Sequence, residues 1–211
     1  MPIRRRILTL VFVALLALVI AVLPASAGGG NNVVVVENTT TGGTLVNAST
    51  QVIPVPMDSV TSANVAVAIN ANCVGCHSTA VAVQILIVKG TPSYFAPGNA
   101  AAAANGGCDS CGAYAYARQH FVQTTTNAHL SGATRARIAE LRQQISTTAA
   151  SILPSDGATD PDLTRNHELD AKLDALTSEL ISVVTVGLQQ SGDDTTVLQD
   201  NVEVDQSTPG S

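Results

Sequence analysis

The chain has few aromatic and few charged residues for a length of 211. It contains no tryptophan, three tyrosines and three phenylalanines, and Asp, Glu, Lys and Arg together make up 12% of it. With so few large rings, neither a stacking platform for nucleic-acid bases nor a thick core is expected. The apolar residues are mostly alanine and valine, so we expect thin layers of secondary structure that approach one another closely.

Basic residues are scarce and are concentrated at the N-terminus. Three of the ten Lys and Arg residues are Arg4, Arg5 and Arg6, which leaves seven to accompany sixteen Asp and Glu. Proteins that bind nucleic acid gain most of their affinity from Lys and Arg side chains that neutralise phosphates. The composition therefore argues against a nucleic-acid partner.

The first 27 residues have the pattern of a secretory signal. The arginines precede an apolar run (7–23), and Pro24 and an A-x-A cleavage site (25–27) follow. An uncleaved membrane anchor is the alternative, although 17 residues are at the lower limit for crossing a bilayer. We expect cleavage, a secreted or cell-wall-exposed mature chain without a membrane span, and an unidentified protein or cell-envelope component as its partner.

Charge divides the rest of the chain into regions. Residues 38–117 contain three charged side chains, residues 131–190 contain thirteen, and residues 191–211 contain five acidic ones and no basic one. Shifts of this size mark a change in architecture. The predicted regions are a Val/Thr/Gly-rich N-terminal segment (28–59), a cysteine-bearing β region (60–128), a helical hairpin (129–190) and a disordered acidic tail (191–211).

A repeat with a period of 35 residues is the most specific feature. Nine positions of the window 64–84 recur unchanged in 99–119, and both copies contain Asn-x-x-Cys-x-x-Cys. In each copy a short alternating segment leads to a turn that begins at Asn70 or Asn105, and an alternating strand follows. Each copy is therefore predicted to be a β-hairpin, and two hairpins side by side would form one small β layer.

The remaining patterns complete an α+β fold. Both faces of residues 79–88 are apolar, which predicts a strand covered on both sides. Ser131 is a suitable N-cap, and two helices joined by a Pro/Gly loop predict an αα-hairpin. An apolar stripe on the second helix is either the face packed on its own domain or a homodimer seam. The stripe consists of Leu169, Leu173, Leu176, Leu180 and Val184.

The four cysteines admit several chemistries. In an oxidising compartment Cys73, Cys76, Cys108 and Cys111 are expected to form structural disulfides with no cofactor, in a connectivity that the sequence leaves open. The alternative is one zinc ion held by all four. Thiol–disulfide exchange is disfavoured, because strands rather than a helix follow both pairs.

A c-type haem is a further alternative. Cys73, Cys76 and His77 match the C-x-x-C-H motif, in which two thioethers hold the porphyrin and the histidine ligates iron. The second copy has Gly112 in place of that histidine, so a role shared by both copies would not include His77. Candidates for the second axial ligand are Met57, His120 and His129.

The duplicated cysteine motif, followed by Ala-x-Ala-x-Gln, an apolar strand and an Arg/Glu/Leu-rich helical segment, resembles a group of secreted actinobacterial proteins of unknown function. The resemblance covers about residues 60–187, and members are often named peptide zinc metalloproteases. Such a protease needs H-E-x-x-H on a helix. Here the His-Glu pair is His167-Glu168, and Ala171 occupies the position of the second histidine.

No catalytic set is recognisable, since a Gly-x-Ser-x-Gly elbow and a phosphate-binding loop are also lacking. The sequence therefore predicts a secreted or wall-exposed structural or interaction protein stabilised by its paired CxxC motifs. An extracytoplasmic haem protein and a Cys₄ zinc module are the alternatives.

Overall fold

The computed structural model describes residues 30–55, 59–125, 129–151 and 160–207, with side chains from residue 167 onward in the last range. The predicted signal segment (1–27) and Met57 lie outside these residues. The described chain has mixed α and β character, as the sequence predicts. Its elements are β1 (Asn32–Asn38), β2 (Thr44–Val55), β3 (Ser59–Val60), β4 (Ala63–Ala71), β5 (His77–Lys89), β6 (Tyr94–Phe95), β7 (Gly98–Gly106), β8 (Gly112–Thr124), α2 (Gly132–Ser151), α3 (Asp160–Gln190) and β9 (Thr195–Ser207).

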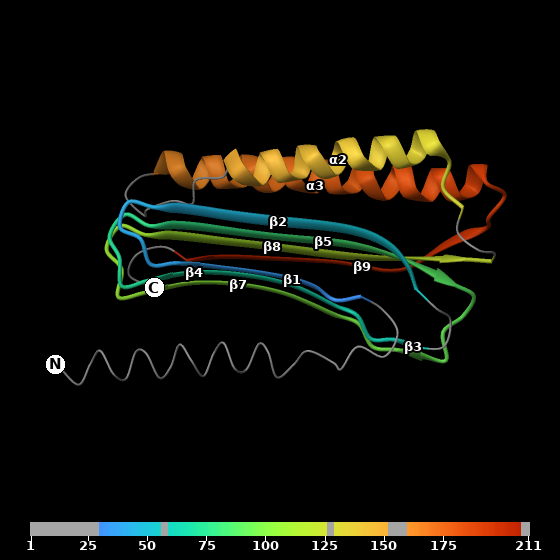
Figure 1. The fold of residues 1–211 in the computed structure, drawn as a ribbon, viewed down its shortest axis with the longest axis horizontal. Helices are drawn as coiled ribbons and strands as arrows, with labels where there is room; N and C mark the ends of the chain where they lie inside the picture. Colours follow the sequence, from blue (N-terminus) through green and yellow to red (C-terminus); the bar gives the residue numbers. More distant parts are fainter. Residues whose placement is uncertain (1–29, 56–58, 126–128, 152–159, 208–211) are drawn as a thin grey trace.

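These elements form three layers (Figure 1). A three-stranded parallel sheet has the order β1-β4-β7, and a four-stranded sheet has the order β2-β5-β8-β9. In the second sheet β2, β5 and β8 are parallel, and β9 is antiparallel to β8. The four-stranded sheet lies between the helices and the three-stranded sheet. At one end, the short strands β3 and β6 form a separate pair.

The predicted hairpins are wrong, because the two strands of each copy do not pair with each other. β4 pairs with β7, and β5 pairs with β8, at the constant offset of 35 residues. Each cysteine turn instead folds the second strand over the first, into the facing sheet. This arrangement buries the alanine faces of both strands against each other, whereas a flat hairpin layer would leave one face uncovered. The copies are thus stacked rungs of a parallel β-solenoid.

The N-terminal segment supplies a further rung. β1 pairs with β4, and β2 pairs with β5. The polar residues of the repeat therefore have counterparts in this rung: Asn32 for Asn64, Asn38 for Asn70 and Gln51 for Gln84. This rung has no cysteines, and its turn is one residue shorter, because Asn38 precedes Thr44 by six positions whereas Asn70 precedes His77 by seven. A comparison at constant offset loses the register there, so the rung is hidden in the sequence.

Buried amide side chains join the rungs at their equivalent positions. The Asn32 Nδ2 donates to Asn64 Oδ1 at 2.8 Å, and the Asn64 Nδ2 donates to Asn99 Oδ1 at the same distance. Asn64 Nδ2 also donates to the carbonyl of Ala82 in the facing sheet, at 3.0 Å. The asparagine ladder therefore fixes the stacking of the rungs and also ties the two sheets together.

Further ladders repeat this arrangement. At the cysteine end, Asn70 Nδ2 donates to Asn105 Oδ1 at 2.8 Å and to the carbonyl of Gly112. In the four-stranded sheet, Gln119 Nε2 donates to Gln84 Oε1 at 2.8 Å. Asn70 and Asn105, predicted as turn residues, thus brace the turns as well as beginning them.

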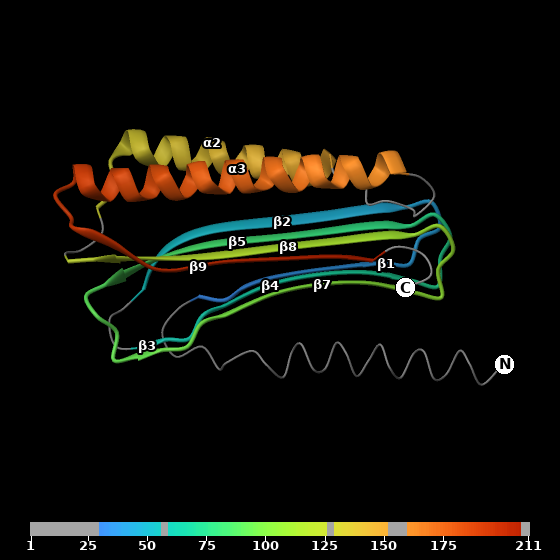
Figure 2. The ribbon, with the colours of Figure 1, turned by 180° about the vertical axis from the view of Figure 1, so that it is seen from behind.

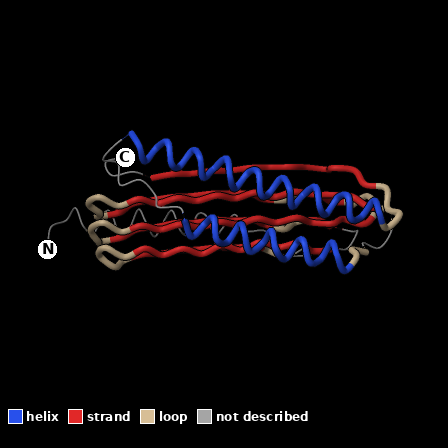
Figure 3. The backbone as a smooth tube through the Cα atoms, turned by 90° about the horizontal axis from the view of Figure 1, so that it is seen from above, coloured by secondary structure: helices blue, strands red, loops and turns tan. Residues whose placement is uncertain are grey.

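The two helices cover the outer face of the four-stranded sheet. Figure 3 shows them lying over the strands, with α2 against β2 and β5 and α3 against β8 and β9. β5 is buried on both faces, as predicted. The predicted N-cap is also confirmed, since Ser131 Oγ accepts the Thr134 amide at 3.1 Å.

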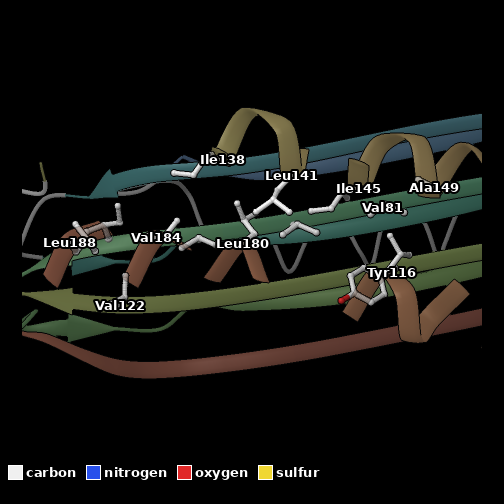
Figure 4. Packing of buried hydrophobic residues seen from close by; sticks show 14 of the residues in the cluster. Val81, Tyr116, Val122, Ile138, Leu141, Ile145, Ala149, Leu180, Val184 and Leu188 are labelled. Carbon is white, nitrogen blue, oxygen red and sulfur yellow. The ribbon is translucent and has the colours of Figure 1, made fainter. Parts of the chain in front are cut away.

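The apolar stripe of α3 lies inside the protein. Leu173, Leu180 and Val184 are fully buried in the main hydrophobic cluster, and Leu169 and Leu176 pack against it. Figure 4 shows this packing of helix residues on the β-sheet. The stripe is therefore the inner face of the helix, and a homodimer would have to use another surface.

The predicted disordered acidic tail is wrong for residues 195–207, which form β9. This strand pairs along most of β8, and the Arg118 guanidinium holds Asp200 at 2.8 Å. Asp205 Oδ2 also accepts the backbone amide of Ala103 on the edge of β7. β9 thus covers the last rung of the solenoid (Figure 2). The unpaired backbone groups along the edge of β8 bind this strand, and the acidic composition of residues 195–207 does not reveal that such an edge is available.

Neither described helix contains a segment that is both long and apolar enough to cross a membrane.

Replacing Asn64 by alanine is expected to lower the free energy of unfolding by about 2–3 kcal/mol, because it leaves buried amide partners unsatisfied. Urea unfolding followed by circular dichroism measures the effect. Asn47→Ala, at an exposed position of β2, is the matched control and should change stability by less than about 0.5 kcal/mol. Similar losses for the two variants would contradict the ladder.

Candidate functional site: the four-cysteine cluster

The two cysteine turns stack on each other along one side of the solenoid, where β4 leads into β5 and β7 leads into β8. Val74 and Asp109 form a parallel bridge, and the Gly75 amide donates to the Asp109 carbonyl at 2.9 Å. Both turns have left-handed residues at the same two places. Asn72 and Gly107 occupy the first, with φ of 54° and 62°, and Gly75 and Ser110 occupy the second, with φ of 61° and 54°. The duplicated sequence therefore gives a duplicated backbone.

This stacking brings all four cysteines together. Their sulfur atoms lie within 4.8 Å of one another. Cys73 and Cys76 are at disulfide distance, with an S–S separation of 2.06 Å, and the Cys73 Sγ lies 3.5 Å from the Sγ of Cys108. Cys108 and Cys111 are free thiols. The sequence alone identified the four residues, and the stacked turns explain why they meet.

The first rung lies against one side of the cluster. The Cys76 Sγ lies 3.2 Å from the carbonyl oxygen of Thr40, and the Cys73 Sγ lies 3.6 Å from that of Asn38. Cys73, Cys76 and Cys111 are buried, and Cys108 is partly exposed. Burial, together with the hydrogen bond to Cys111, raises the pKa of the Cys108 thiol to about 11. The cluster is thus a compact sulfur site with one accessible side.

The donor set fits a metal ion. A tetrahedral zinc ion with Zn–S bonds of about 2.3 Å places its sulfurs about 3.8 Å apart, which is compatible with sulfurs that all lie within 4.8 Å. Two CxxC turns in register also resemble the paired chelating turns of Cys₄ sites. Metal binding and the Cys73–Cys76 bond exclude each other, because a ligating cysteine must be a thiolate.

The haem constellation is not brought together in the same way. His77 begins β5 beside the cluster, but His120 follows Gly112, the register partner of His77, by eight positions along β8. At about 3.3 Å per residue, that separation is about 26 Å. His129 comes after the far end of β8. Two of the three axial candidates are therefore too distant, and the third, Met57, lies outside the described residues.

His167 and Glu168, the nearest approach to a zinc-protease motif, are both exposed on α3. They lie about one helical turn before Asp170, which accepts a hydrogen bond from Tyr114 near the start of β8. Neither belongs to the group of side chains that the structure brings together as a candidate metal site, which consists of the four cysteines.

A second polar cluster, which the sequence analysis missed, lies beneath α3. Alternate residues of β8 point toward the helix, and Tyr116 donates to Asp174 at 2.7 Å while Arg118 binds Asp200 with two nitrogens. His120 is buried, with its Nδ1 3.6 Å from Asp200. The period-two spacing of Tyr, Tyr, Arg and His was the signal that could have identified this cluster. Its members fasten α3 and β9 to the sheet.

Burial lowers the pKa of His120, and Arg118 lowers it further, although the attraction of Asp200 opposes both. Folding therefore disfavours the protonated form of His120.

No protein-family model, curated protein or solved structure matches the chain, so the resemblance noted from the motif stays a prediction.

Acidification is expected to destabilise the protein through His120. The folded state binds fewer protons at this residue than the unfolded state, so stability is complete above pH 6.5 and falls as the pH drops below it, by at most about 1.4 kcal/mol per pH unit. Urea titrations from pH 7.5 to 5 on the wild type and on His120→Gln measure the difference. The variant should lose that part of the slope, whereas His167→Gln, at an exposed histidine, should retain it. Parallel curves for wild type and His120→Gln would contradict the assignment.

Ser110→Gly is expected to raise the free energy of unfolding by about 0.5–1 kcal/mol, because glycine adopts the left-handed conformation without the clash that serine suffers. Urea unfolding at fixed redox conditions tests this. Ser146→Gly, at an exposed position of α2, should instead lower stability by about 0.5 kcal/mol. A loss of stability in Ser110→Gly would contradict the turn geometry.

Proposed function

We propose that the protein is an extracytoplasmic structural or interaction protein without catalytic activity, built as a rigid β-solenoid whose turn end is locked by cysteines. The observation that carries this proposal is the identity of the stacked residues. Positions that repeat from rung to rung are amides, alanines and cysteines, which brace the scaffold, rather than paired acids and bases. Rigidity is the property that such ladders supply.

The cysteine cluster serves this role as a covalent clip. The Cys73–Cys76 bond closes the turn of one rung, and in an oxidising compartment the equivalent Cys108–Cys111 bond is expected to close the next. Oxidation of that second dithiol releases two protons and passes two electrons to the compartment's disulfide-forming oxidant. The secretory pattern of residues 1–27 supports an oxidising location.

A Cys₄ zinc module is the second candidate, favoured by the mutual proximity of all four sulfurs. In that form both pairs stay reduced. One ion, rather than a disulfide within each turn, holds the four cysteines and thereby links the two rungs. A haem protein has weaker support, because the sulfurs of Cys73 and Cys76 are buried against neighbouring turns. Thioether bonds to a porphyrin would have to displace those turns.

The intact mass of the protein from its native host, before and after alkylation, tests the proposal. We expect a chain that begins at Gly28, lacks four hydrogens relative to the four-thiol form, and accepts four alkyl groups only after reduction. The Cys108→Ser variant is the matched control. Its tryptic or chymotryptic peptides should contain the Cys73–Cys76 disulfide and no other.

Other results would contradict the clip. Thiols that alkylate only after a chelator removes stoichiometric zinc would establish the metal module. An added mass of one haem would establish electron transfer. An uncleaved chain recovered from the cytoplasm would overturn the proposed location.

A further inference from the structure

The two ends of the rung stack differ. At one end the antiparallel strand β9 pairs with the outer edge of β8 and becomes the edge strand of that sheet. At the opposite end, no strand within the described ranges pairs with the outer edge of β2, which runs for 12 residues from Thr44 to Val55. Figure 1 looks onto this end, with β2 nearest to the viewer. The edge therefore offers unpaired backbone donors and acceptors of the kind to which an added strand binds.

A groove runs beside this edge, between β2 and α2. Its volume is about 350 Å³, and it is open to solvent along one side. Its lining is Ala48, Ser49 and Thr50 from the strand and Ala139, Arg142 and Gln143 from the helix. An extended segment added to β2 would direct alternate side chains into this space. The groove is lined by small and polar residues, so it suits short polar side chains rather than large apolar ones.

The charge beside the groove is positive. Arg142 is exposed and has no ion-pair partner among the described residues, in contrast to Arg137, which binds Glu140 at 2.6 Å and also pairs with Glu179. Arg135 lies two helical turns before Arg142 and therefore on the same face of α2. Neither arginine has an ion-pair partner within the part of the chain that the structure describes, and two such guanidinium groups on one face favour an acidic partner.

The other end of the same stack already contains an acidic strand paired with a sheet edge beside a helix. There, β9 is an acidic strand, with Asp200, Glu203 and Asp205, and it is added to a sheet edge beside helix α3. One of its carboxylates is held by an arginine, Arg118. The open edge has the same components, a strand edge, a helix and an arginine, but lacks the acidic strand.

A second copy of the chain is a poorer occupant. Symmetric pairing of two β2 edges places the helix α2 of one copy beside that of the other. The Arg142 and Arg135 side chains of both copies would then lie along one shared seam, and like charges brought together oppose association. Charge complementarity instead selects a foreign segment.

We propose that the outer edge of β2 and the groove beside α2 bind an extended acidic segment of a partner protein by β-strand addition. This inference rests on the interaction role proposed above, to which it adds the chemistry of the partner. It does not depend on the state of the cysteines, so that a failure to bind would leave the mass-spectrometric test of the clip unaffected.

A fluorescent peptide with the sequence of residues 195–207 is the probe, because it is an acidic strand that this protein already accommodates. Its binding to the full chain is followed by fluorescence anisotropy at low salt. Arg142→Gln should weaken binding about two- to fivefold, as expected for a partly exposed ion pair. Lys172→Gln, which removes a positive charge at an exposed position of α3, is the matched control and should leave the affinity unchanged.

Backbone pairing is tested without altering the protein. Peptides N-methylated at alternate residues on one edge should lose at least about tenfold in affinity, whereas methylation on the other edge should be tolerated. Hydrogen exchange should show new protection in β2. Protection changes confined to β8 and β9 would mean that the peptide replaces β9 or adds to its outer edge, and would overturn the proposal. Equal binding by the Arg142→Gln and Lys172→Gln variants, self-association through β2, or no binding at all would also overturn it.

Discussion

The hydrogen bonds between stacked asparagine side chains hold the three rungs in one register. Asn64, in the middle rung, donates both to Asn99 of the next rung and to the Ala82 carbonyl of the facing sheet. A slip of one residue would point every asparagine outward and every outer side chain into the thin alanine interior. The same register then places the two cysteine turns on top of each other. The cluster of four sulfurs is therefore a consequence of the ladder rather than an independent feature.

The two ends of the stack have different surroundings. At one end β9 covers the last rung and contributes Asp205 and Asp200 to the edges of both sheets. At the other end, within the described residues, the first rung presents the edge of β2 beside an unpaired arginine. Exposed strand edges are templates for further pairing, and at one end the acidic antiparallel strand β9 takes the place of the parallel edge of β8. The partner segment proposed above would bind at the end that lacks such a strand.

Local patterns in the sequence predicted local structure well. The period of 35, the strand from Thr79 to Val88, the N-cap Ser131 and the inner face of α3 all follow from residues close together in the chain. Which strands pair with each other could not be predicted in this way. A strand–turn–strand unit has the same sequence pattern whether its two strands lie side by side in one sheet or in two facing sheets. β9 was missed because five acidic residues suggested a solvated tail. Its partner, the edge of β8, became available only once the rungs were stacked.

The parallel stacking of rungs is the central claim, and nuclear Overhauser contacts between backbone protons test it most directly. The account predicts contacts that join Val67 to Ala102 and Val81 to Tyr116, at the constant offset of 35 residues. It also predicts none of the close Hα–Hα contacts of an antiparallel hairpin between β4 and β5. Such hairpin contacts across the turn at Cys73 and Cys76 would contradict the solenoid, and with it the origin of the cysteine cluster.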